Sequence, residues 1–209
     1  IATTTEVENF PGFPNGVTGP ELAELMQKQA ERFGARLVFD EVTEVDFQHR
    51  PFALKTHGEA YQAKTVIIAT GAAPRKLGVP GENEFLGRGV SYCATCDGFF
   101  FRNKEAMVVG GGDSALQEGL FLTKFAARVR IVHRRDQLRA GPALQERARR
   151  NEKMQFVWNS VIKEIHGDGA AQAVTLKDVR SGETRQEPVS GVFVYIGHEP
   201  NTHLFRGQL

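Results

Sequence analysis

The chain has 209 residues, of which 41% are hydrophobic and 24% are charged, and its formal net charge is +1. This composition is typical of one or two ordinary globular domains and argues against disorder. No apolar run reaches the roughly 18 residues of a membrane-spanning helix, and the start lacks the basic and apolar regions of a signal peptide. We therefore expect a cytoplasmic protein without membrane contact.

The first third of the chain predicts one helix and several short strands. Thr18 and Glu21 have capping-box spacing, Pro20 suits a first helical turn, and Gly34 is a stop signal, so a helix is expected between them. Strands are expected over residues 36–39, 41–47, 52–55 and 65–69. The last is wholly apolar or β-branched, which predicts a buried strand that ends at Thr70 and Gly71.

The rest of the chain predicts a strand over 106–109, a glycine-rich loop, and a helix whose small residues allow close packing on a sheet. Further elements are expected as follows: a strand over 128–132, an arginine-rich helix over 142–153, strands over 154–159 and 161–166, a hairpin turning near Ser181-Gly182, and a buried strand over 191–197.

This order of elements repeats the order seen between residues 34 and 71, so the chain predicts two related α/β units. A glycine-rich loop precedes the later unit, and the same offset would place the loop of the earlier unit before the first residue. We therefore expect the sequence to be an incomplete copy of a protein with two nucleotide sites.

The chain has two cysteines, and they lie three residues apart in Cys93-Ala94-Thr95-Cys96. Chance would place two cysteines at this spacing roughly once in a hundred chains, so the pair suggests thiol–disulfide exchange. A structural disulfide and half of a zinc site are the alternatives. No metal is expected, because the nearest downstream histidine, His133, is far along the chain.

Between residues 128 and 150 there are eight arginines but only two acids, Asp136 and Glu146. A basic stripe of this kind can bind nucleic acid, but the segment has no Phe, Tyr or Trp for base stacking. A localised anion site beside a solvated helix is the better explanation, so no nucleic-acid partner is expected.

A dinucleotide fingerprint fits Gly110-x-Gly112-x-x-Ala115, since a strand is predicted before it and a helix after it. The free amides at the start of that helix can hold a pyrophosphate. The next strand ends at His133-Arg134-Arg135, with Arg139 nearby, where an NAD site commonly has an acid. Guanidinium groups suit the 2′-phosphate of NADP, so NADPH is favoured over NADH. An ordinary strand end with solvated arginines is the alternative.

With these motifs assembled, the sequence resembles bacterial-type, low-molecular-weight thioredoxin reductases. The segments that carry the resemblance are Thr5 to Gly12, Ile68 to Ala72, Cys93 to Phe100, Gly110 to Ala115, His133 to Asp136, and Gly197 to Thr202. The resemblance implies two Rossmann-like, three-layer ββα domains. An NADPH domain over 75–199 would be inserted into an incomplete FAD domain formed by 1–74 and 200–209.

The resemblance also implies a route for electrons from NADPH through FAD to the Cys93–Cys96 disulfide and then to thioredoxin. Reduced Cys93 would attack thioredoxin, Cys96 would face the flavin and resolve the mixed disulfide, and Asp97 would carry the proton. A turn or capping role is the alternative for Asp97. The domain over 75–199 would rotate so that the flavin meets the nicotinamide and the disulfide in turn.

By the same resemblance, other residues take binding roles. FAD would contact Asn9, Ala69, Thr70 and Gly71. NADPH would contact Gly110, Gly112, Asp113, Ser114, Ala115, His133, Arg134, Arg135 and Arg139. Thioredoxin would dock on Arg88, Phe99 and Phe100, although consecutive phenylalanines are more often core residues. A homodimer is usual in the family.

The sequence departs from the family at both ends, because it has neither the first glycine-rich loop nor the C-terminal Gly-Asp segment of the FAD site. This places FAD binding by the present chain in question. Two other functions are therefore kept open: a flavoprotein that reduces a peroxiredoxin, and a non-catalytic NADPH-binding remnant. RNA binding by the basic stripe is a distant further alternative.

Overall fold

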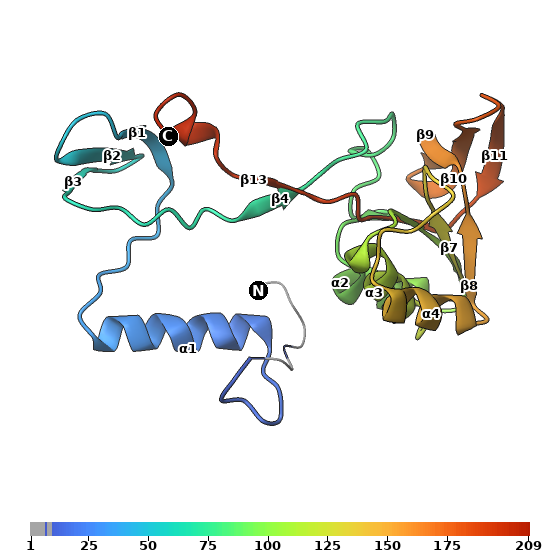
Figure 1. Cartoon of the computed structure of the whole chain (residues 1–209), viewed down its shortest axis with the longest axis horizontal. Helices are drawn as coiled ribbons and strands as arrows, with labels where there is room; N and C mark the ends of the chain where they lie inside the picture. The colour runs from blue at the N-terminus through green and yellow to red at the C-terminus, as the bar shows by residue number, and fades with distance from the viewer. Residues whose placement is uncertain (1–6, 8–9) are drawn as a thin grey trace.

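The computed structural model describes residue 7 and residues 10–209 (Figure 1). One lobe holds a sheet with helices packed on it. The other holds a small antiparallel sheet and a helix that lies apart from this sheet (Figure 1). The two lobes are joined by a ribbon of two antiparallel strands, β4 (Ala72–Pro74) and β13 (His198–Pro200). None of the described helices is both long and apolar enough to cross a membrane.

A five-stranded parallel sheet forms the centre of the larger lobe. Its strands, in spatial order, are β5 (Val90–Ser91), β12 (Gly191–Val194), β6 (Glu105–Val109), β7 (Arg128–Val132) and β8 (Met154–Val157). The predicted strands at 106–109 and 128–132 are confirmed. The predicted strands at 154–159 and 191–197 form but end earlier.

Helices cover one face of this sheet and an antiparallel meander covers the other. Along β6, Ala106 and Val108 pack with the helices, whereas Met107 and Val109 pack with the meander. This alternation is the two-residue period of a strand buried on both faces. The result is the expected three-layer ββα arrangement.

The helical layer consists of α2 (Ala94–Asp97), the 3₁₀ helix η1 (Gly98–Phe101), α3 (Asp113–Leu122) and α4 (Pro142–Arg150). Close packing of α3 depends on Gly119, where a Cβ would lie 2.9 Å from Ile131 Cδ1 on β7. The predicted small-residue face of this helix is therefore confirmed. The meander consists of β9 (Ser160–Asp168), β10 (Ala170–Asp178) and β11 (Thr184–Pro188).

The smaller lobe contains α1 (Gly19–Arg32), a second meander and the 3₁₀ helix η2 (His203–Phe205). As predicted, Thr18 caps α1, accepting a hydrogen bond from the Glu21 amide at 3.3 Å. The meander is formed by β1 (Val42–Asp46), β2 (Phe52–Thr56) and β3 (Ala60–Ala63). It matches the three-stranded meander of the larger lobe, which supports the predicted repeat.

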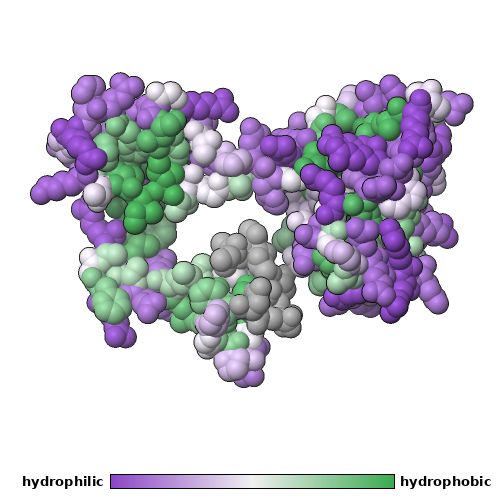
Figure 2. Space-filling view, in the orientation of Figure 1, coloured by the Kyte–Doolittle hydropathy of each residue, from purple (hydrophilic) through white to green (hydrophobic). Residues whose placement is uncertain are grey.

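Two predicted strands in this lobe are wrong. Residues 36–39 and 65–69 are not strands, and Ile67 in the second segment is 93% exposed. A parallel strand is stable only between neighbouring strands that share its hydrogen bonds, and no described strand pairs with either segment. The apolar side chains of α1 do not form a core face, since Leu22 is the one large apolar residue of this helix that is buried. Figure 2 shows hydrophobic surface over β1–β3 and along α1.

Candidate functional site

The glycine-rich loop follows β6 and passes tightly between neighbouring elements. At Gly110, whose φ is +151°, a Cβ would lie 2.3 Å from the Tyr195 carbonyl oxygen and 2.8 Å from Ala115 Cβ. At Gly111 a Cβ would lie 2.4 Å from Cε1 of His133. Only glycine fits at these two positions, and Ala115 is small for the same reason. The loop therefore has the close-packed form that a dinucleotide site requires.

The loop leads directly into the first turn of α3. Gly112 is the N-cap of this helix, and the space beside it is open. Asp113 Oδ1 accepts a hydrogen bond of 2.7 Å from the Gly141 amide and so ties the loop to the start of α4. Ser114 is exposed on the first turn. The first amides of a helix lack partners within the helix, so this end of α3 can receive a phosphate.

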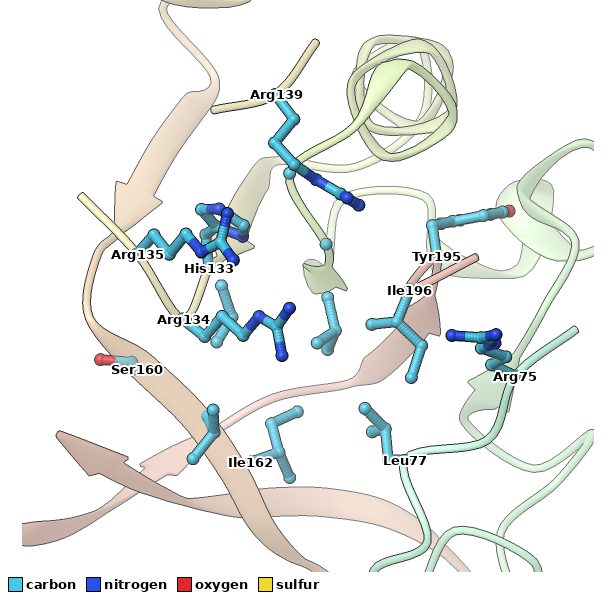
Figure 3. A pocket seen from close by; sticks show the side chains of 15 residues that line it. Arg75, Leu77, His133, Arg134, Arg135, Arg139, Ser160, Ile162, Tyr195 and Ile196 are labelled. Atoms are coloured by element: carbon cyan, nitrogen blue, oxygen red, sulfur yellow. The ribbon is translucent and has the colours of Figure 1, made fainter. Parts of the chain in front are cut away.

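A cavity of about 370 Å³ lies beside the loop, and none of its fifteen lining residues is acidic. Arg134, Arg135 and Arg139 line it from the segment after β7, and Arg75 lines the opposite side (Figure 3). Together these guanidinium groups give the cavity a strongly positive wall. The cavity therefore suits a polyanionic ligand.

The buried His133 holds the arginine segment in place. Its Nε2 donates a hydrogen bond of 3.0 Å to the Gln137 carbonyl oxygen. Burial lowers the pKa of His133, and the nearby arginines lower it further. The segment then returns to the glycine loop, where the Arg139 amide donates a hydrogen bond of 2.7 Å to the Gly111 carbonyl oxygen.

The eight arginines of the basic stripe have different partners. Three of those that lie outside the cavity wall are paired with carboxylates: Arg128 with Glu105, Arg130 with Glu187, and Arg150 with Glu146. Asp136 is itself paired with Arg180, so its charge is compensated. The localised anion site predicted from the sequence describes this arrangement better than a continuous nucleic-acid stripe.

Cys93 and Cys96 form a disulfide at the start of α2. Cys93 is the N-cap residue, and its Sγ accepts a hydrogen bond from the Cys96 amide at 3.2 Å. The Cys93 amide is held by Ser91 Oγ at 2.9 Å. Cys93 is half-buried, whereas Cys96 is exposed and Asp97 follows it at the end of the helix. A partner can therefore reach this disulfide from solvent, which suits exchange chemistry better than a buried structural bridge.

The three phenylalanines after the cysteine pair divide between surface and core. Phe99 is 60% exposed and Phe100 is 68% exposed, whereas Phe101 is buried. The alternative that Phe99 and Phe100 are core residues is therefore wrong. Phe100 lines a shallow depression together with Arg88 and Asp97. The structure thus places Arg88 and Phe100, two of the three residues predicted to dock a partner, next to Asp97 at the end of α2.

The residues predicted to contact FAD lie near the connecting ribbon. Thr70 Oγ1 donates a hydrogen bond of 2.7 Å to the Asn201 carbonyl oxygen, and Asn201 Nδ2 donates one of 2.9 Å to the Thr70 carbonyl oxygen. The Asn201 amide also donates to the Gly71 carbonyl oxygen at 3.0 Å. Ala69 is exposed beside them. Asn9 lies outside the described residues.

Arg75 and Tyr195 are two of the cavity residues that were not predicted from the sequence. Arg75 follows the proline of β4, and its amide donates a hydrogen bond to the Gly197 carbonyl oxygen at 3.0 Å. Tyr195 follows β12 and is the one polar side chain in the apolar run 192–196. A tyrosine within an otherwise apolar strand was the feature of the sequence that could have identified Tyr195.

Comparison with known proteins agrees with this geometry. A model of the pyridine nucleotide-disulphide oxidoreductase family matches residues 2–209. The thioredoxin reductase of Streptomyces coelicolor is 51% identical over 210 residues, which cover 100% of this chain and 65% of that protein. The thioredoxin reductase of Mycolicibacterium smegmatis is 51% identical over 209 residues, covering 100% of this chain and 67% of that protein.

Among solved structures, the thioredoxin reductase of Lactococcus lactis in its FR conformation matches with a TM-score of 0.88 and 44% identity. The match covers 98% of this chain and 68% of that one. The chain thus spans about two thirds of the length of these relatives. The resemblance stated from the motifs is confirmed, and the chain belongs to the pyridine nucleotide-disulphide oxidoreductase family.

Proposed function

We propose that the protein to which this chain belongs is an NADPH-dependent thioredoxin-disulfide reductase that uses FAD. One observation carries the proposal: a solvent-accessible Cys93–Cys96 disulfide lies in the same lobe as a glycine loop and an arginine-lined cavity. Relatives named thioredoxin reductase are 51% identical to this chain over its whole length. The overall reaction transfers a hydride from NADPH and takes up one proton, giving NADP⁺ and a dithiol.

The glycine loop and the charge of the cavity support NADPH as its ligand. The glycine loop leaves room beside Gly112 for a pyrophosphate, and the first turn of α3 supplies amide donors. Arg134, Arg135 and Arg139 then face the adenosine end, where a 2′-phosphate adds negative charge. Asp113 would also shape the site by holding Gly141.

FAD would be held in part by the Ala69 to Gly71 segment, which Asn201 holds in place. The cofactor, when bound, relays electrons from the nicotinamide to the disulfide, a step that thiols and nicotinamide do not perform efficiently by themselves. We assign the FAD domain to residues 1–74 and 200–209 and the NADPH domain to 75–199. The ribbon of β4 and β13 would then be the crossing about which the domains rotate.

At the disulfide, Cys93 would attack the thioredoxin disulfide and Cys96 would resolve the mixed disulfide. Asp97 lies directly after Cys96 and would protonate the leaving thiolate. The exposed rings of Phe99 and Phe100, with Arg88, would form the docking surface for thioredoxin. The active protein would be a cytoplasmic homodimer, as is usual for the family.

The test uses the purified full-length protein with FAD, NADPH and oxidised thioredoxin, and measures the thiols that form. We expect thiol release that requires all three components and stops in the variant Cys93→Ser/Cys96→Ser. Absence of thiol release from the FAD-loaded wild-type protein would reject the proposal. Equal rates with NADH and NADPH would reject the assignment of the arginine cavity.

A further inference from the structure

The Tyr195 hydroxyl contacts α2, the helix that begins at the Cys93–Cys96 disulfide. It accepts a hydrogen bond of 2.6 Å from the amide of Ala94, the first residue of α2. Ala94 is fully buried, so its amide needs a protein acceptor. Tyr195 is therefore the residue that holds the start of the helix on which the disulfide is built.

Glu118 on α3 completes this contact. Its Oε2 accepts a hydrogen bond of 3.3 Å from the Tyr195 hydroxyl, and its carboxylate also interacts with the Ala94 amide. Burial raises the pKa of Glu118, and burial together with the nearby Glu118 carboxylate raises the pKa of Tyr195. The tyrosine thus stays protonated, its O–H donates a hydrogen bond to Glu118, and its oxygen lone pairs accept the hydrogen bond from the Ala94 amide.

The backbone of Tyr195 is fixed at the nucleotide loop. Its amide donates a hydrogen bond of 2.8 Å to the Val109 carbonyl oxygen, and its carbonyl oxygen occupies the space that a side chain at Gly110 would need. Its ring lies at the edge of the cavity with the hydroxyl directed away from Arg134 and Arg135 (Figure 3). One residue therefore joins the nucleotide loop to the disulfide helix.

We propose that Tyr195, oriented by Glu118, is a positioning residue for the Cys93–Cys96 disulfide. The inference rests on the proposed redox function of that disulfide. The Ala94 contact with the hydroxyl is present in the disulfide form, in which the Cys93–Cys96 ring is closed. In this role the contact stabilises the oxidised form, and an ionised Glu118 beside Ala94 disfavours a thiolate at Cys93, the preceding residue.

The experiment measures the equilibrium between the disulfide and glutathione in the purified chain, with thiols counted after acid quenching and alkylation. Two glutathione molecules reduce the disulfide to the dithiol and give one oxidised glutathione. Tyr195→Phe keeps the ring but removes the hydroxyl. We expect the equilibrium constant for reduction to rise about five-fold, which corresponds to one typical net hydrogen bond.

Glu118→Gln keeps an acceptor for the hydroxyl but removes the charge. We expect the reduced pair to react with iodoacetamide at neutral pH about three-fold faster, because the thiolate fraction rises. In the double variant, Tyr195→Phe should raise the equilibrium constant less than five-fold, since Glu118 orients the same hydroxyl.

Tyr92→Phe is the matched control. Tyr92 precedes Cys93 in the chain and also donates to a carboxylate, that of Glu82 at 2.7 Å, but this bond holds the segment at Leu77 and Gly78 rather than α2. We expect Tyr92→Phe to leave the glutathione equilibrium and the alkylation rate unchanged. A shift as large as that of Tyr195→Phe would overturn the proposal.

Wild-type values in both Tyr195→Phe and Glu118→Gln would also overturn the proposal. Circular dichroism checks that each variant folds; if Tyr195→Phe does not fold, Glu118→Gln decides alone, because it leaves the ring in place. Glutathione replaces nucleotide, flavin and thioredoxin in this assay. Failure of the proposed reductase function is therefore seen separately, in the NADPH assay of the full-length protein.

Discussion

The arginine wall of the cavity predicts selectivity for a nucleotide with a 2′-phosphate. We expect Arg134→Ala/Arg135→Ala to weaken binding of 2′,5′-ADP much more than binding of 5′-AMP. Hydrogen bonds to charged groups contribute about 1.5 to 3 kcal/mol when buried. Both arginines are exposed in the free chain, so solvent screening favours the lower end.

If each arginine contributes about 1.5 kcal/mol to the binding free energy, removing both lowers the affinity for 2′,5′-ADP on the order of 100-fold. Binding of 5′-AMP should change little, because its proposed contacts are with the glycine loop and the remaining wall. Isothermal titration calorimetry of the chain with each nucleotide measures both affinities. The quantity that tests the prediction is the ratio of the two.

The matched control is Arg149→Ala/Arg150→Ala, which removes the same charge from two adjacent arginines on α4. Arg150 pairs with Glu146 and Arg149 donates to Gln145, and neither lines the cavity. This control should leave the affinity ratio unchanged. If the Arg134/Arg135 variant also keeps the wild-type ratio, or if the control lowers it equally, the assignment of the phosphate site is refuted.

Three further predictions test packing and charge. Gly111→Ala should weaken 2′,5′-ADP binding and lower stability by about 1 to 3 kcal/mol, because the new methyl overlaps the fixed His133 ring; an unchanged urea midpoint would contradict this. Glu187→Ala should lower the free energy of unfolding in urea by about 3 kcal/mol, because the buried Arg130 loses its main partner. The glutathione equilibrium should not change. A decrease of less than about 1 kcal/mol in the free energy of unfolding would be inconsistent with that pairing. The pKa of His133 is lower in the folded state than in the unfolded state. Its contribution to stability is therefore complete above the unfolded pKa of about 6.5 and is lost as the pH falls below that value. Thermal midpoints measured from acidic to neutral pH should depend less on pH in His133→Gln than in the wild type.

Predictions from local pattern were accurate where the structure depends on contacts close in the chain. The strand, glycine loop and helix from 106 to 122 were predicted because alternation, glycine spacing and small helical residues all lie within one short segment. The cysteine pair was likewise visible from its spacing alone. The segment at 65–69 was misread, because an apolar sequence shows that a strand can be buried but not that neighbouring strands are present.

The amino-acid sequence by itself determined the family, the dinucleotide loop, the redox cysteine pair and the order of most elements, since each depends on residue types at fixed short spacings. Only the tertiary structure decided which arginines line the cavity and which are neutralised by glutamates. It also placed Tyr195 against Ala94, 101 residues away along the chain. Such contacts arise when parallel strands and helices bring distant segments together, and no local pattern records the distance between them.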